Sequence, residues 1–206
     1  MERPGYWLDD SAPIVLDTSA IINLNATACA VAILSAFPDI IFVTENVLGE
    51  LNQARGLRTT DADQTGSLIA QGLIRKCGLN DAALEFFEEL SIGQAADTLG
   101  DGEASSIALA LAIQGVAIVD EKKARRICLQ RYPRLQVAFS TDIICHTKVE
   151  LALGRPAMKM AVLQALQLAR MSVTPDHLEW IIDLVGAMDL QPCTSLSKAA
   201  RTRMVR

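Results

Sequence analysis

The sequence predicts an α/β fold in which helices wrap a central parallel sheet of about four or five strands. Short apolar runs at 13–17, 39–44, 116–120 and 135–140 are typical of strands buried on both faces. The stretch "LIRKCGL" (73–79) indicates one further short strand. Longer helical patterns separate these runs, and strands that alternate with helices are typical of a parallel sheet. A chain of 206 residues can bury the core of one such domain with a small extension.

Residues typical of helix starts and ends mark the segments between the strands. Gly100 or Asp101 opens the strongest helical pattern and Gly115 closes it. In the last predicted helix, Thr174 is the expected cap and Pro175 the first helical residue. The predicted helices span 19–36, 45–55, 59–72, 81–90, 100–115, 121–132, 141–153, 156–171 and 175–187.

Three regions are expected along the chain. Residues 1–155 form the main domain, and 156–190 form a helical extension packed on it. The tail 191–206 is polar and basic and is expected to be mobile.

Composition narrows the class of protein. The chain is 50% hydrophobic and 21% charged, which is typical of a globular protein, and its apolar runs are too short for a membrane span. The N-terminus "MERPGYWLDD" does not read as a signal peptide, so a cytoplasmic protein is expected. Five scattered cysteines without a C-x-x-C pair argue against a disulfide framework or a zinc site. Only His146 and His177 are present, so chemistry built on histidine is not expected.

Charge is unevenly distributed. Residues 1–103 hold 16 acids and 5 bases, whereas 104–206 hold 8 acids and 14 bases. An acidic half beside a basic half is compatible with a metal-binding pole next to a surface that meets phosphate.

Four carboxylates are predicted near one edge of the sheet. Asp17 and Asp120 each end an apolar run. Glu50 lies within two helical turns of the second strand, and Glu103 lies in the first turn of the helix before the Asp120 strand. Because ligands of such sheets bind at the carboxyl ends of the strands, the four acids are candidates for one site. Each also has a purely structural interpretation: Asp17 and Asp120 as helix caps, Glu50 as a solvated acid, and Glu103 as a charge that suits its helix dipole.

Carboxylates in this arrangement point to a hard divalent cation. Mg²⁺ and Mn²⁺ prefer carboxylate oxygens and retained waters. Crowded acids repel one another unless a cation binds among them. A bound metal can activate water and stabilise the charge on a phosphodiester, so no serine, cysteine or histidine nucleophile is needed.

Four motifs carry a resemblance to a known family. "IVLDTSAIINL", "FVTENVLGEL", "GDGEASSIALALA" and "AIVDEKKARRI" resemble the successive motifs of the PIN-domain nucleases over residues 13 to about 150. The forms G-x-G-E-A and D-E-x-x-x-R are similar to one prokaryotic PIN-like subgroup. The resemblance implies a three-layer PIN-like fold and a metal-dependent ribonuclease directed at single-stranded RNA, often the toxin of a toxin–antitoxin pair. The expected partners are therefore RNA and a small antitoxin, with a homodimer left open.

The resemblance also assigns roles to residues. The catalytic, metal-binding acids it implies are Asp17, Glu50, Glu103 and Asp120. The polar neighbours that match the family, and are expected to contact substrate, are Thr18, Ser19 and Asn23. Asp101 competes with Glu103 as the third acid, and Glu121 is expected beside the site or on the surface.

The helix after Asp120 is basic. Lys122 and Arg126 are four residues apart, so they share one helical face and are expected to contact the phosphates of the substrate. Two other interpretations stay open: a solvated charged face, or an internal pairing of Arg125 or Arg126 with an acid.

Two other functions are considered beside the ribonuclease. A PIN-like module without catalysis would bind nucleic acid or protein, although the presence of all four acids counts against it. A phosphohydrolase of the haloacid-dehalogenase type needs a second aspartate two residues after the first, and Ser19 occupies that position.

Overall fold

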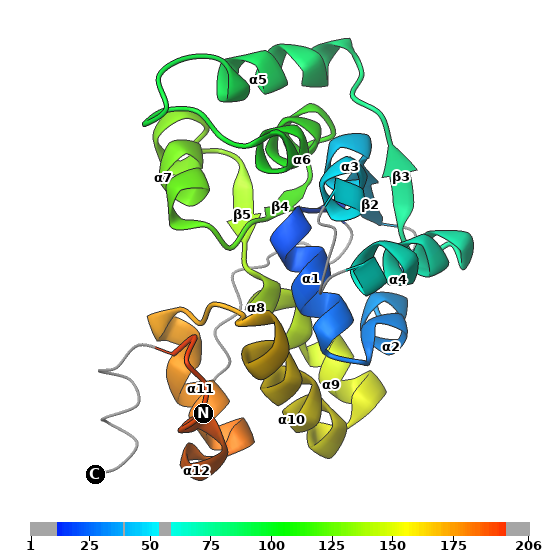
Figure 1. The fold of residues 1–206 in the computed structure, drawn as a ribbon, viewed down its shortest axis with the longest axis vertical. Helices are drawn as coiled ribbons and strands as arrows, with labels where there is room; N and C mark the ends of the chain where they lie inside the picture. Colours follow the sequence, from blue (N-terminus) through cyan, green and yellow to red (C-terminus); the bar gives the residue numbers. More distant parts are fainter. Residues whose placement is uncertain (1–11, 39, 54–58, 197–206) are drawn as a thin grey trace. The chain divides into compact units, whose positions relative to one another are not determined.

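The structure is a computed structural model that describes residues 12–38, 40–53 and 59–196 (Figure 1). The chain divides into two compact units, here called the sheet unit and the helical unit. The sheet unit is Asp9–Ile21 and Phe37–Phe139, and the helical unit is Met1–Leu8, Ile22–Ala36 and Ser140–Arg206. The predicted boundaries at residues 155 and 190 stay predictions, and most of the tail lies outside the described residues.

A five-stranded parallel sheet forms the centre of the sheet unit, as the sequence predicts. Its order is β3-β2-β1-β4-β5, so the first strand lies in the middle. Val15 of that strand pairs with Phe42 on one side and Ala117 on the other. The strands are β1 (Ile14–Leu16), β2 (Ile41–Thr44), β3 (Arg75–Cys77), β4 (Val116–Ile118) and β5 (Gln136–Ala138).

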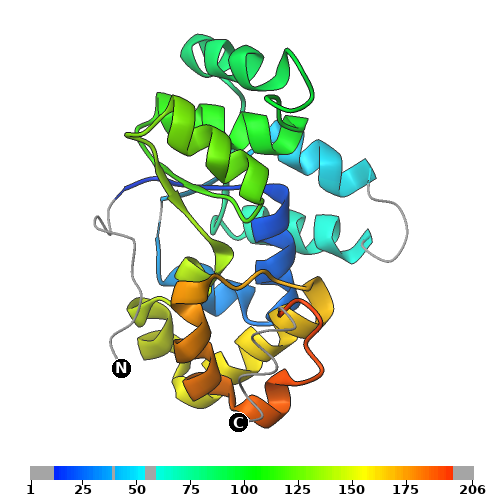
Figure 2. The ribbon, with the colours of Figure 1, turned by 90° about the vertical axis from the view of Figure 1, so that its left-hand side faces the viewer.

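One face of the sheet packs against three helices, α5 (Asp81–Ser91), α6 (Asp101–Ala112) and α7 (Lys122–Arg131) (Figure 2). Val15, Ala117 and Val119 contribute the sheet side of this core. Almost every residue of α6 from Gly102 to Ala110 is buried, which explains why small residues fill that helix. The close packing of α6 on β1 and β2 fixes where its first turn lies.

Helices begin almost at once where three strands end. Asp17 alone separates β1 from α1 (Thr18–Ala26), and α3 (Glu45–Gln53) follows β2 directly. Asp120 lies two residues after β4, and Glu121 alone separates it from α7. The carboxyl ends of these parallel strands lie at the same edge, so this edge gathers the acids that follow them. The remaining helix of the sheet unit is α4 (Thr59–Ala70).

The helical unit contains the end of α1 and every element after β5. Within it, α10 contacts α8, α9 and α11, and α2 contacts α9. Its elements after α1 are α2 (Ala30–Ser35), α8 (Ser140–Ile144), α9 (Thr147–Leu153), α10 (Arg155–Gln164), the π-helix η1 (Ala165–Ala169), α11 (Pro175–Val185) and α12 (Ala187–Leu190). Within the described ranges, each helix is too short or too polar to cross a lipid bilayer.

Several predicted helices are divided in the structure. The predicted helix 19–36 is wrong as one element, because Ala28 takes a positive φ of 55° between α1 and α2. The predicted helix 156–171 becomes α10 and a π-turn that ends at Arg170, which has a φ of 59°. The predicted helix 141–153 divides into α8 and α9 at Cys145 and His146, whereas the predicted helix 175–187 corresponds to α11, which ends at Val185.

A buried histidine lies in the helical unit. His177 of α11 places Nε2 2.9 Å from Oδ1 of Asp142, and both side chains are almost fully buried. Thr174, the predicted cap of α11, makes a hydrogen bond to Nδ1 of His177 at 2.8 Å. His146 is the cap of α9 and accepts a hydrogen bond from the Lys148 amide.

Candidate active site

Asp17 is a buried carboxylate that also caps a helix. Its side chain is 1% exposed and accepts the amide of Ala20 at 2.6 Å, while both oxygens accept the Ser19 hydroxyl at 2.9 Å. Burial, and then repulsion from Asp120 and Glu50, raise the pKa of Asp17 to about 7 although these hydrogen bonds oppose the shift. Capping α1 alone does not require a charge that is buried close to other acids. The position of Asp17 therefore favours a role beyond the cap.

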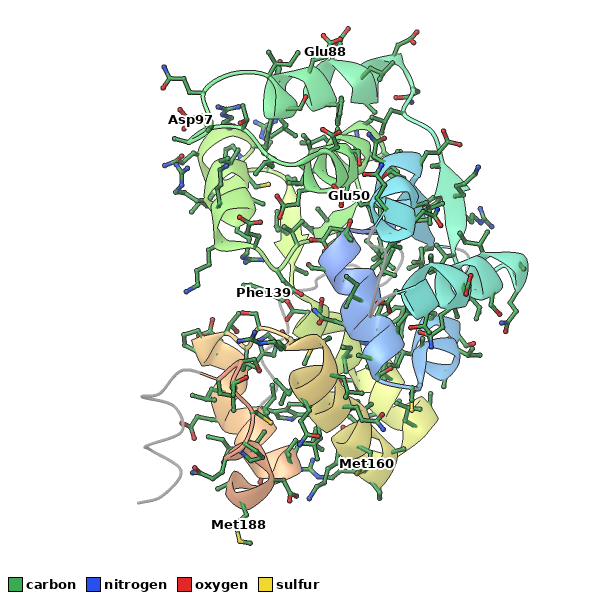
Figure 3. All side chains as sticks on the ribbon, in the orientation of Figure 1. Glu50, Glu88, Asp97, Phe139, Met160 and Met188 are labelled. Atoms are coloured by element: carbon green, nitrogen blue, oxygen red, sulfur yellow. The ribbon has the colours of Figure 1, made fainter. Side chains whose placement is uncertain are left out.

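Glu50 lies on α3 and reaches across to two other elements (Figure 3). Its Oε1 accepts the backbone N–H of Gly102 at 2.7 Å, and its Oε2 accepts the Thr18 hydroxyl. These contacts join α3 to the starts of α1 and α6. Glu50 is therefore not a solvated helix acid.

Glu103 lies in the first turn of α6 and is half-buried. Burial, a hydrogen bond with Glu121 and repulsion from Glu121, Asp17 and Glu50 raise its pKa to about 8. Asp101, its competitor for the role of third acid, is exposed. The structure therefore brings Glu103, and not Asp101, among the other acids.

The four predicted acids form one electrostatic cluster. Asp120 follows β4 and is half-buried, and its charge raises the pKa of Asp17. Asp17 and Glu50 in turn raise the pKa of Glu103. Asp17 thus interacts electrostatically with each of the other three acids, so it links them at this edge of the sheet.

Glu121 is a fifth acid in contact with the cluster. It is exposed and precedes α7, yet its side chain forms a hydrogen bond with Glu103. Its position directly after Asp120 is the signal in the sequence that could have brought it into the predicted set.

The three polar residues predicted beside the acids form hydrogen bonds with different parts of the protein. Thr18 and Ser19 donate hydrogen bonds to Glu50 and Asp17, so they hold the acids in place. Asn23 belongs to the helical unit, where its buried side chain donates to the Ser140 hydroxyl at 3.1 Å. A substrate contact by any of the three stays a prediction.

The basic side chains of α7 bind the loop before α6. Lys123 donates to the carbonyl of Ala95 at 2.7 Å, and Arg126 donates to that of Ala96 at 2.9 Å. Arg131 donates to the carbonyl of Asp97 at 3.1 Å. Asp97 is labelled beside α7 in Figure 3. The sequence suggested an internal acid as the partner of such an arginine, whereas these three side chains donate to backbone carbonyls and Arg126 donates also to Oε1 of Gln130.

A pocket of about 400 Å³ lies along the same helix. Lys122, Arg125 and Arg126 line it together with apolar side chains such as Leu129 and Leu135. Lys122 is exposed, and the guanidinium of Arg125 stacks 3.4 Å from the centre of the Phe139 ring. Of these cations, Lys122 is the one best placed to meet a ligand from solvent.

The donor chemistry of the cluster fits a hard divalent cation. Among the described residues, no three histidine, cysteine or acidic side chains stand in an arrangement ready to hold a metal ion. The carboxylate of Glu50 is instead engaged with Thr18 and Gly102. Burial and neighbouring negative charges nevertheless raise the pKa of Asp17 and Glu103, and a bound cation would offset both effects.

Comparison with known proteins identifies the family. A family model described as a PIN domain matches residues 13–187, which is most of the chain and includes all four acids. No curated protein and no solved structure matches the chain significantly. The parallel sheet and the order of the acidic motifs agree with this match. The chain therefore belongs to the PIN-domain family, whose fold is of the nuclease type.

Proposed function

We propose that the protein is a metal-dependent endoribonuclease that hydrolyses phosphodiester bonds in single-stranded RNA. The observation that carries the proposal is the cluster of Asp17, Glu50, Glu103 and Asp120, in which burial and the neighbouring carboxylates raise the pKa of Asp17 and Glu103. A fold gains no stability from such repulsion, so a site that retains it is a candidate for function. The PIN-domain match supports the nuclease class.

The four acids would hold Mg²⁺ or Mn²⁺. When bound, such an ion lowers the pKa of a water and offsets the charge that develops on the phosphate. Ser19 and the Ala20 amide hold Asp17, while Thr18 and the Gly102 amide hold Glu50. These contacts fix the carboxylates before substrate arrives, which limits the reorganisation that the reaction requires.

Lys122 would contribute to binding of the RNA backbone. It is exposed at the first residue of α7, two positions after Asp120. A cation so close to the acids can contact a phosphate that flanks the cleaved bond, with little dependence on base sequence. The toxin role and its small antitoxin partner belong to this proposal through motifs that resemble those of PIN toxins. A cytoplasmic location belongs to it through the scattered cysteines and the polar N-terminus, and a homodimer stays open.

Cleavage of a labelled single-stranded RNA tests the proposal. We expect products with Mn²⁺ or Mg²⁺, none with EDTA, and little cleavage of a duplex of the same sequence. Glu50→Gln should lose activity, whereas Asp63→Asn, which changes an exposed acid on α4, should keep it. RNA that is bound but never cut in any metal would instead favour the non-catalytic PIN-like module.

A further inference from the structure

We propose that Gly102 is a positioning residue of this site, because its amide and its missing side chain together fix the carboxylate of Glu50. The consequence for metal binding rests on the proposed function. The contact itself does not, since it lies wholly within the protein.

The space above Gly102 is filled by Glu50. A Cβ atom at position 102 would lie 2.2 Å from Oε2 of Glu50, 2.5 Å from its Cδ and 2.8 Å from its Oε1. Each distance is far below van der Waals contact. Residue 102 can therefore carry a side chain only if the Glu50 carboxylate moves away.

The backbone conformation does not account for this glycine. Gly102 is the second residue of α6 and has no positive φ, so other residue types could adopt its conformation. Glycine in a helix costs about 1 kcal/mol relative to alanine. The close approach of Glu50 is the feature that a side chain at position 102 would disturb, by displacing the end of the flexible Glu50 side chain.

Glu50 also completes the start of α6. The cap residue Gly100 has no side chain to accept the first free N–H groups of the helix. The carboxylate of Glu50 accepts one of them, the N–H of Gly102, at 2.7 Å. A negative charge at this end of the helix is favoured by the helix dipole.

Both oxygens of Glu50 retain capacity for a cation. Oε1 accepts a hydrogen bond from the Gly102 amide, and Oε2 accepts one from the Thr18 hydroxyl. A carboxylate has about four lone-pair positions, so these two contacts leave room for a metal ion. Gly102 and Thr18 thus hold the carboxylate without using all of its lone pairs.

The first experiment detects the hydrogen bond between the Gly102 amide and Glu50 in the metal-free protein. The amide proton of Gly102 is assigned by NMR in the metal-free wild type and in Glu50→Ala. We expect an upfield shift and faster hydrogen exchange for this amide in the variant, because its carboxylate acceptor is gone. An unchanged Gly102 resonance and exchange rate would overturn the proposal.

The second experiment is a double-mutant cycle with Gly102→Ala and Glu50→Asp. The aspartate is one methylene shorter, so its carboxylate withdraws from the added methyl group. Gly102→Ala should weaken Mn²⁺ binding by about 10-fold or more in the wild type, as for other groups that orient metal ligands. The same change should have almost no effect when residue 50 is aspartate.

Two glycines serve as matched controls. Gly66→Ala adds a methyl group in a helix of the same unit with nothing within 4 Å. Gly115→Ala places its Cβ 2.5 Å from the carbonyl oxygen of Pro13, at the opposite edge of the sheet, and controls for a clash that lowers stability without touching Glu50. Neither should change Mn²⁺ affinity per folded molecule.

The outcomes separate this inference from the proposed function. Equal losses from Gly102→Ala in both backgrounds, or Mn²⁺ affinity unchanged by it, would overturn the positioning role. A wild type that binds no Mn²⁺ would contradict the proposed function, and the NMR experiment would then decide the Gly102–Glu50 contact alone.

Discussion

At the scale of single residues, Asp17 combines a structural and a chemical role. It accepts the Ala20 amide at the start of α1, as a helix cap does, yet it is 1% exposed and close to other acids. Its pKa is raised to about 7, so at neutral pH the metal-free protein holds a charge that its surroundings disfavour. Such a conflict between stability and function is typical of sites that bind a cation.

Asp17→Asn should therefore make the metal-free protein more stable at pH 8. The amide can still accept the Ala20 N–H, and it removes a buried charge, which we expect to add about 1–3 kcal/mol to the free energy of unfolding. The same change should abolish the rise in melting temperature that Mn²⁺ causes in the wild type. Thermal melts with and without Mn²⁺ check both effects, and a variant that Mn²⁺ still stabilises as strongly as the wild type would remove Asp17 from the site.

The third acid can be settled by a pair of substitutions. Glu103→Gln should lower RNA cleavage by orders of magnitude, because it removes an anionic group from the cluster. Asp101→Asn should retain activity, since Asp101 is exposed on the same helical turn. Rates measured under single-turnover conditions decide the matter, and the reverse pattern would assign the role to Asp101.

Sequence alone was enough to nominate the four acids, because strand ends and helix starts can be recognised from local patterns. It could not reveal the position of Gly102 under Glu50, since that contact joins residues 52 positions apart. The sequence predicts Glu121 only beside the site or on the surface for a related reason. Its hydrogen bond with Glu103 depends on the tertiary arrangement of α6 and α7. Long-range contacts of single side chains are set by tertiary packing, which no periodicity encodes.

At the scale of elements, α7 divides its cations between two tasks. Lys123, Arg126 and Arg131 donate to carbonyls of the 92–98 loop or of α5, whereas Lys122 is exposed at the start of the helix. The spacing of Lys122 and Arg126 predicted one shared phosphate-binding face. The structure gives Arg126 backbone partners, because the loop lies against that part of α7.

The two cations should therefore respond differently to alanine. Lys122→Ala should weaken RNA binding for every sequence and reduce the slope of log affinity against log salt by about 1, with no change in stability. Arg126→Ala should lower the free energy of unfolding by about 0.5–1.5 kcal/mol, because it removes the hydrogen bonds to Ala96 and Gln130. Salt titrations and thermal melts on the same samples test this, and a loss of salt dependence from Arg126→Ala alone would show that our division of tasks is wrong.

Element prediction succeeded where patterns are local and failed at helix breaks. All five strands lie within predicted runs, and α6 begins next to Gly100 as expected. The predicted helix 19–36 divides at Ala28, where the chain takes a left-handed conformation without a glycine to signal it. The π-helix η1 after α10 also ends in a left-handed residue, Arg170, with no glycine to signal the break.

At the scale of the whole molecule, the acid cluster should make stability depend on pH. The folded state raises the pKa of Asp17 from 3.8 to about 7 and that of Glu103 from 4.5 to about 8. Between about pH 4 and 8 the folded state binds more protons than the unfolded state, so stability must fall as pH rises through this window. Denaturant melts of metal-free protein at pH 5 and pH 8 should show the higher stability at pH 5.

Metal should reverse this trend. Cation binding requires deprotonated carboxylates, so Mn²⁺ should stabilise the protein more at pH 8 than at pH 5. A metal-free stability that rises from pH 5 to pH 8 would contradict the raised pKa values. Asp63→Asn is the matched control, because it removes an exposed acid and should leave the pH dependence unchanged.

A shared cation site among the four acids is tested most directly by an anomalous difference map from a crystal of the protein soaked in Mn²⁺. We expect a manganese peak within about 2.5 Å of carboxylate oxygens of Asp17 and Asp120, with Glu50 or Glu103 close enough to coordinate directly or through water. Asp17→Asn crystals treated in the same way should lose most of that peak. A wild-type map with no manganese at these side chains, or with manganese bound only elsewhere, would contradict the site.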